Sequence, residues 1–145
     1  MSAIKPDEQF VKGTIYDTSL VHMRNKIVEA ARDQASSGWV EIKDPAMVDT
    51  IVSTYGNALN RKILNSCATK PHTMMEILRS TKVPQTTGYR RTLYLIKGQF
   101  LFSHHEIQRG GKQIKKYLST FKEIEFHISK DQELIRVKFQ NSWQN

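Results

Sequence analysis

The stretch from Pro71 to Phe102 constrains the fold more than any other part of the chain. Thr73 and Glu76 have the T-x-x-E spacing of a capping box, which predicts that a helix begins there. Val83-Pro84 then predicts a turn, because proline suits the first turn of a following helix. We therefore expect two short helices joined by a tight turn, with Gly98 ending the second helix before an apolar strand.

The second of these helices, at 84–97, has two chemically different faces. At about 100° per residue, one broad sector can pack against the preceding helices, and Gly88 within it permits a close crossing. That sector contains Gly88, Tyr89, Thr92, Leu93, Leu95 and Ile96. The opposite side contains Thr87, Arg90, Arg91 and Tyr94. We expect the first group to be buried and the second to face solvent or a ligand.

Basic side chains are concentrated in the middle of the chain. Residues 57–122 include thirteen basic and two acidic side chains, a net charge of +11, whereas residues 1–56 sum to −2 and residues 123–145 to −1. A solvated surface normally mixes the two signs, so this concentration indicates a polyanionic partner. A basic face that serves only solubility is the alternative.

The rest of the chain predicts further helices and two hairpins, and so an α+β fold. Caps and apolar spacing predict helices at 19–35, 44–55 and 58–70. Alternating apolar residues predict hairpin strands at 100–108 with 113–119, and at 123–128 with 134–139, each with one buried face. Trp39, Val40 and Ile42 are predicted to form a short apolar link. The expected organisation is an N-terminal arm with two helices (1–56), a basic domain (57–122) and a C-terminal β-hairpin (123–145).

Three helices followed by a two-stranded hairpin is the winged-helix arrangement, and residues 56–119 resemble the ArsR-like family of winged-helix transcription regulators. The resembling segments are 56–64 for the first helix, 75–78 for the second, 84–91 for the recognition helix and 95–101 for the exit into the wing. The resemblance implies a winged helix-turn-helix that binds double-stranded DNA. Helix 84–97 would enter the major groove, and the wing at 100–119 would contact the backbone or the minor groove.

The resemblance also implies which side chains contact DNA. On the recognition helix they are Gln85, Thr86, Thr87, Arg90, Arg91 and Tyr94. On the wing they are Arg109, Lys112 and Lys115. Physical chemistry also favours base contacts by the helix and phosphate contacts by the wing. An arginine fork on the helix can bond guanine O6 and N7 together. A basic hairpin tip is better suited to phosphates, whose contacts set affinity rather than sequence preference.

A homodimer is expected, because similar proteins are usually dimeric and the helices outside the basic domain have apolar stripes. The 20–35 helix, the 44–55 helix or the terminal hairpin would supply the contact. Two other functions remain open for the same basic surface. One is a winged-helix protein-interaction module of the transcription machinery, and the other is binding of structured RNA.

No catalytic residue, cofactor or metal site is expected. The sequence contains no nucleophile elbow or phosphate-binding glycine loop. Cys67, the one cysteine, lies on an apolar stripe, which favours a core position. His104 and His105 are neighbours in a strand and so point to opposite faces. We expect a cytoplasmic protein, because no apolar run approaches the roughly 18 residues of a membrane span and no secretion signal is evident.

Overall fold

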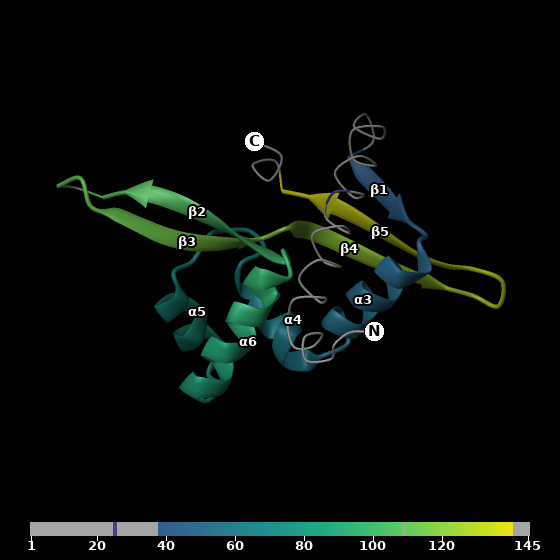
Figure 1. The fold of residues 1–145 in the computed structure, drawn as a ribbon, viewed down its shortest axis with the longest axis horizontal. Helices are drawn as coiled ribbons and strands as arrows, with labels where there is room; N and C mark the ends of the chain where they lie inside the picture. Colours follow the sequence, from purple (N-terminus) through teal and green to yellow (C-terminus); the bar gives the residue numbers. More distant parts are fainter. Residues whose placement is uncertain (1–24, 26–37, 109, 141–145) are drawn as a thin grey trace, which may run out of the picture.

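The computed structural model describes residue 25 and residues 38–108 and 110–140, and it is an α+β fold, as predicted (Figure 1). The helices are α3 (Pro45–Tyr55), α4 (Ala58–Ser66), α5 (Met74–Thr81) and α6 (Gln85–Lys97). The strands are β1 (Trp39–Ile42), β2 (Leu101–Ile107), β3 (Gln113–Ser119), β4 (Phe121–Ile128) and β5 (Glu133–Phe139). The predicted helix at 19–35 lies outside the described residues apart from Asn25, which is helical. Within the described part of the chain, no helix has the length and apolarity needed to cross a bilayer.

Side-chain caps begin three of the helices at the predicted positions. Asp44 accepts a hydrogen bond from the N–H three residues on at 3.1 Å, and Asn57 does the same at 2.9 Å. Thr73 and Glu76 form the full capping box, with reciprocal bonds of 3.1 and 2.9 Å. The bond from the Thr73 N–H lowers the pKa of the Glu76 carboxyl. These caps satisfy backbone groups that a helix start leaves unpaired.

The end of α6 differs in detail from the prediction. Gly98 is the C-cap, but its φ of −78° is that of an ordinary right-handed residue. The left-handed residue is Gln99, with a φ of 67°. At the start of the helix, Pro84 is the N-cap rather than a residue of the first turn.

Two antiparallel sheets meet above the helices. One has the strand order β1-β5-β4, and the other consists of β2 and β3. Only Thr120 separates β3 from β4, so the two hairpins extend in opposite directions from a shared centre (Figure 1). The prediction that residues 39–42 form a link was wrong, because they form β1 and pair with residues 135–138 of β5. The terminal hairpin therefore pairs with an N-terminal strand of the same chain.

Backbone contacts attach the β2–β3 hairpin to the helices at its base. Ser119 N–H donates to the Cys67 carbonyl at 2.9 Å, and its hydroxyl donates to the Leu64 carbonyl at 2.5 Å. His72, just before α5, forms a two-bond bridge with Tyr117 of β3 at 3.0 and 2.7 Å. The base of the hairpin is consequently fixed, while its turn lies far from the helices (Figure 1).

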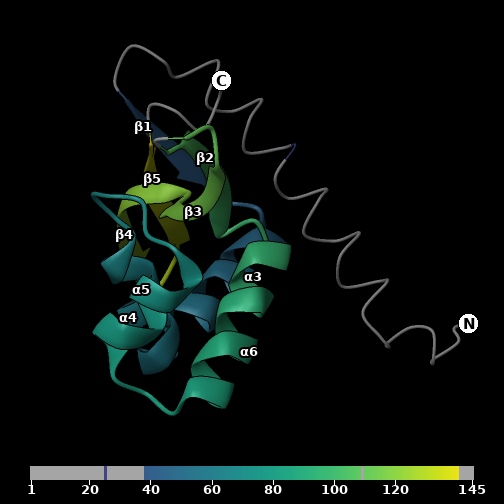
Figure 2. The same cartoon turned by 90° about the vertical axis from the view of Figure 1, so that its left-hand side faces the viewer.

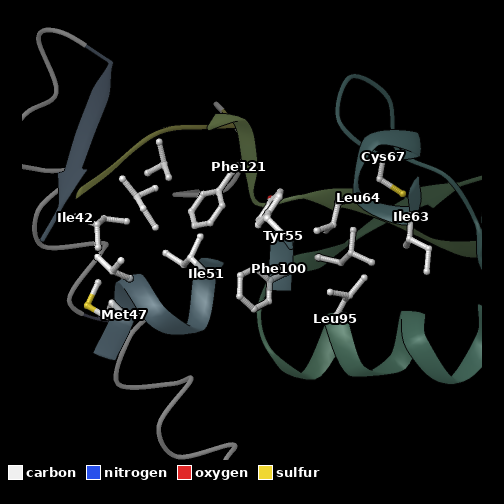
Figure 3. Close-up of a cluster of buried hydrophobic side chains, with 14 of the residues drawn as sticks. Ile42, Met47, Ile51, Tyr55, Ile63, Leu64, Cys67, Leu95, Phe100 and Phe121 are labelled. Carbon is white, nitrogen blue, oxygen red and sulfur yellow. The ribbon is translucent and has the colours of Figure 1, made fainter. Parts of the chain in front are cut away.

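A single apolar core joins the helices to the three-stranded sheet (Figure 3). Phe100, 1% exposed, lies between the end of α6 and the start of β2. Its ring contacts Tyr55 of α3 at 6.2 Å and Phe121 of β4 at 6.3 Å between centroids. Burial raises the pKa of the Tyr55 hydroxyl. Because these three rings come from distant parts of the sequence, they hold α3, α6 and both hairpins in one unit.

The predicted buried face of the terminal hairpin is confirmed for β5 but not for β4. Ile135 and Val137 of β5 are buried. Phe126 and Ile128 of β4, predicted to be buried, are 41% and 68% exposed. The reason is that β4 is an outer strand of the sheet, which in the described part of the chain pairs with β5 on one side only.

Candidate nucleic-acid interface

The helix α6 is anchored along one narrow face. Gly88, Thr92 and Leu95 are its buried residues. A Cβ at position 88 would lie 2.8 Å from Leu78 Cδ2 and 2.9 Å from Val83 Cγ2, so two side chains pack directly against this glycine. The Thr92 hydroxyl donates to the Gly88 carbonyl at 2.7 Å. Its burial therefore leaves no unpaired polar group in the core.

Opposite this buried face, α6 presents four residues at helical spacing, Thr86, Arg90, Leu93 and Lys97, which we call the outward stripe. All four are exposed, Leu93 at 37%. Among the described residues, no acidic side chain forms an ion pair with Arg90. Viewed from the side, α6 lies at the edge of the helical layer (Figure 2). A rigid helix therefore presents two cations, a hydroxyl and an aliphatic group along one line.

One prediction about this helix was wrong. Tyr89 and Leu93 were expected to pack inward, but Tyr89 is 48% exposed and Leu93 belongs to the outward stripe. At about 100° per residue, both lie too far from the line through Gly88, Thr92 and Leu95 to reach the core. The outward face of α6 is thus more apolar than the sequence pattern suggested.

A shallow hollow lies along the flank of α6. Among the described residues it is lined by Thr87, Arg90, Arg91 and Tyr94, the four residues predicted to share the polar side. Arg91 and Tyr94 are half-buried, and burial raises the pKa of the Tyr94 hydroxyl. Two guanidinium groups beside two hydroxyls form a donor-rich surface that suits a phosphate or the acceptor edge of a base.

The remaining predicted contact residues are divided between α6 and the β2–β3 hairpin. Gln85 is exposed in the first turn of α6, near Thr86 and Thr87. Lys112 and Lys115 are exposed on the hairpin, and the ion pairs of the described residues involve neither of them. Arg109, at the turn, lies outside the described residues.

Some of the basic residues are already engaged within the protein. Lys116 forms an ion pair with Glu106 at 3.0 Å, and His104 approaches the same carboxylate at 3.7 Å. The Arg61 guanidinium donates to the Tyr55 carbonyl at 2.7 Å and holds the α3–α4 junction. Such cations are less available to an external anion than those of the outward stripe.

Cys67, His104 and His105 are further residues whose side chains can bind metal ions. Cys67 is fully buried, as predicted, and burial raises the pKa of its thiol to about 11. The thiol is consequently protonated at neutral pH, and this form is a poor nucleophile and a poor metal ligand. His105 is exposed and lies opposite Lys115 in the β2–β3 ladder, whereas His104 lies opposite Lys116 on the other face of the hairpin. The described residues contain no group of three side chains suited to a metal ion.

Two residues of the outward stripe were not among the predicted contacts. Lys97 could have been found from the sequence, since it follows Thr86 and Arg90 at helical spacing. Leu93 could not, because periodicity alone treats an exposed leucine as part of the core.

Comparison of the chain with protein-family models, with curated proteins and with solved structures gave no match.

Proposed function

We propose that residues 57–119 form a winged helix-turn-helix and that the chain regulates transcription by binding double-stranded DNA through α6. The observation that supports this most is the outward stripe, with Arg90 at its centre and the opposite face of α6 fully buried. A helix held in this way can enter a major groove without losing its own packing.

The arrangement of the elements supports the winged-helix part of the proposal. The helices α4, α5 and α6 are followed directly by the β2–β3 hairpin. The His72–Tyr117 bridge adds a short extended segment between the first two helices, paired with the last strand of the hairpin. This bridge fixes the direction of the hairpin relative to α5 and α6.

The side chains of α6 divide naturally between reading bases and binding the backbone. Arg90 has the reach and the fork geometry to bond guanine O6 and N7. Leu93, beside it, suits the C5-methyl group of thymine, which is the apolar feature of the major groove. Lys97, Lys112 and Lys115 suit phosphates, because an ammonium group is a flexible point charge.

We expect two copies to act together on DNA. Similar winged-helix proteins bind as dimers, and a symmetric dimer would place two recognition helices about 34 Å apart on half-sites one helical turn from each other. The dimer would also double the number of phosphate contacts and so steepen the dependence of affinity on salt.

A competition experiment tests the choice of nucleic acid. Labelled duplex DNA, duplex RNA and single-stranded DNA of equal length and sequence would be titrated with the protein at one salt concentration, with fluorescence anisotropy as the readout. We expect duplex DNA to bind at least about tenfold more tightly than duplex RNA, because the A-form major groove is too deep and narrow for a helix. Equal or tighter binding of RNA would contradict the proposal.

A protein-interaction module is the second candidate, because Tyr89 and Leu93 make the outward face of α6 partly apolar. If that is the function, the same titration gives no saturable binding to any of the three nucleic acids. Binding of duplex DNA by the wild type that Tyr89→Ala leaves intact, and Arg90→Ala removes, would decide for DNA.

A further inference from the structure

The outer strand β4 differs from the rest of the surface in displaying large apolar side chains beside an open strand edge. Phe126 and Ile128 are 41% and 68% exposed, on the face that packs against α3. Within the described part of the chain, β4 pairs with β5 on one side only. An outer strand with exposed apolar groups is a template for pairing with another strand.

We propose that β4 is the homodimer interface, and that two copies pair their β4 strands antiparallel about a twofold axis through Phe126. The two three-stranded sheets would then form one continuous sheet of both copies. A twofold contact requires a self-complementary surface, because each residue meets the partner's equivalent set. Phe126 would lie opposite Phe126 of the partner subunit, and Ile124 opposite Ile128 of the partner subunit.

The charges along β4 favour a twofold axis through Phe126 over an axis through Glu125 or Ile124. About Phe126, Glu125 lies opposite the partner's His127, whose ring N–H can donate a hydrogen bond to the carboxylate, so this register places no like charges opposite each other there. An axis through Glu125 would place this carboxylate opposite its own copy, and an axis through Ile124 would place Glu123 opposite the partner's Glu125. Like charges directly opposite each other destabilise a strand pair, so both alternatives are disfavoured. Within one chain, the Arg136 guanidinium donates to Glu125 Oε1 at 3.0 Å, and His127 Nε2 lies 3.3 Å from the same oxygen, so these groups gather on the polar face.

The inferred interface lies apart from the proposed DNA-binding surface. The β4–β5 hairpin extends away from the β2–β3 hairpin, toward the opposite end of the molecule (Figure 1). Neither α6 nor the wing is covered by the second copy in this arrangement. This dimer interface adds to the proposed function and is tested without DNA. The interface and the DNA-binding proposal can therefore fail independently of each other.

Mass measurement by sedimentation equilibrium tests the interface on the full chain. We expect the wild type to show twice the chain mass at micromolar concentration, and Phe126→Lys and Ile128→Lys each to weaken the dimer at least about tenfold, since each places an unpaired charge in the interface. Ile107→Lys is the matched control, because Ile107 is 75% exposed on the other hairpin. A wild type that stays monomeric, or a dimer that survives both β4 substitutions, would overturn the proposal.

Cross-linking tests the register. In antiparallel pairs, facing Cα atoms lie about 4.5–5.5 Å apart, within the range of a disulfide. Phe126→Cys should therefore form a covalent dimer under mild oxidation, whereas Ile128→Cys should not, because its equivalent in the partner is displaced along the strand. The native Cys67 is fully buried and does not interfere. Cross-linking through position 128 instead of 126 would refute the register.

Discussion

Replacing Arg90 by glutamate is expected to weaken binding to duplex DNA by about 100-fold or more. The substitution removes a contact worth about 1–3 kcal/mol if Arg90 bonds a guanine. It also places a carboxylate near the phosphates, and each further 1.4 kcal/mol is about a tenfold loss of affinity. Fluorescence anisotropy with a bound DNA sequence obtained by selection gives the dissociation constant.

The control for this experiment is Lys130→Glu. Lys130 is exposed at the turn between β4 and β5, and its replacement changes the net charge by the same amount. We expect it to weaken binding only a few-fold, through long-range electrostatics that salt screens. Because Arg90 is exposed, its replacement should change the free energy of unfolding by less than about 0.5 kcal/mol. Equal losses in the two variants would mean that binding depends on net charge alone.

Replacing Phe100 by alanine is expected to lower the free energy of unfolding by about 3–5 kcal/mol. The loss combines the transfer free energy of the ring with the cavity that remains between α3, α6 and β4. Edge-to-face contacts with Tyr55 and Phe121 would also be lost, worth about 0.5–1.5 kcal/mol per pair beyond area burial. Urea denaturation followed by circular dichroism measures the change.

Two further variants calibrate this result. Phe100→Leu should lose less, because the leucine fills most of the space that alanine leaves empty. Met75→Ala, at a residue 54% exposed on α5, should change stability by less than about 0.5 kcal/mol. A loss below about 1 kcal/mol for Phe100→Ala would show that the three-ring cluster is not the centre of the core.

The parts of the fold that local chemistry determines could be predicted from the sequence. The caps at Asp44, Asn57 and Thr73 each depend on a side chain and a backbone group three residues away. The β2–β3 and β4–β5 hairpins could also be predicted, because the two strands of a hairpin are neighbours in sequence.

The parts that depend on distant pairing could not be predicted. Four residues at 39–42 contain too little alternation to indicate a strand, and their partner β5 comes at the far end of the chain. The bridge between His72 and Tyr117 is a single residue pair with no periodic signal. Such pairings are chosen by the packing of the whole core rather than by any local pattern.

Of the outward stripe, Thr86 and Arg90 were among the contacts predicted from the sequence, whereas Leu93 and Lys97 were not. Arg90 and Arg91 were placed away from the core because, at about 100° per residue, they fall opposite the sector that contains Gly88 and Leu95. Leu93, Phe126 and Ile128 were each assigned to buried faces, since sequence alternation cannot show where the covering element ends. An exposed apolar residue becomes recognisable only when its neighbours in space are known.

The salt dependence of duplex binding tests the central claim most directly. The wild-type protein would be titrated against labelled duplex DNA at several salt concentrations, with fluorescence anisotropy as the readout. We expect the logarithm of the affinity to fall linearly with the logarithm of salt concentration, with a slope of about −3 or steeper, because α6 and the wing together offer several phosphate contacts. A folded protein that binds no duplex DNA even at low salt, or binds it with a slope near zero, would contradict the account.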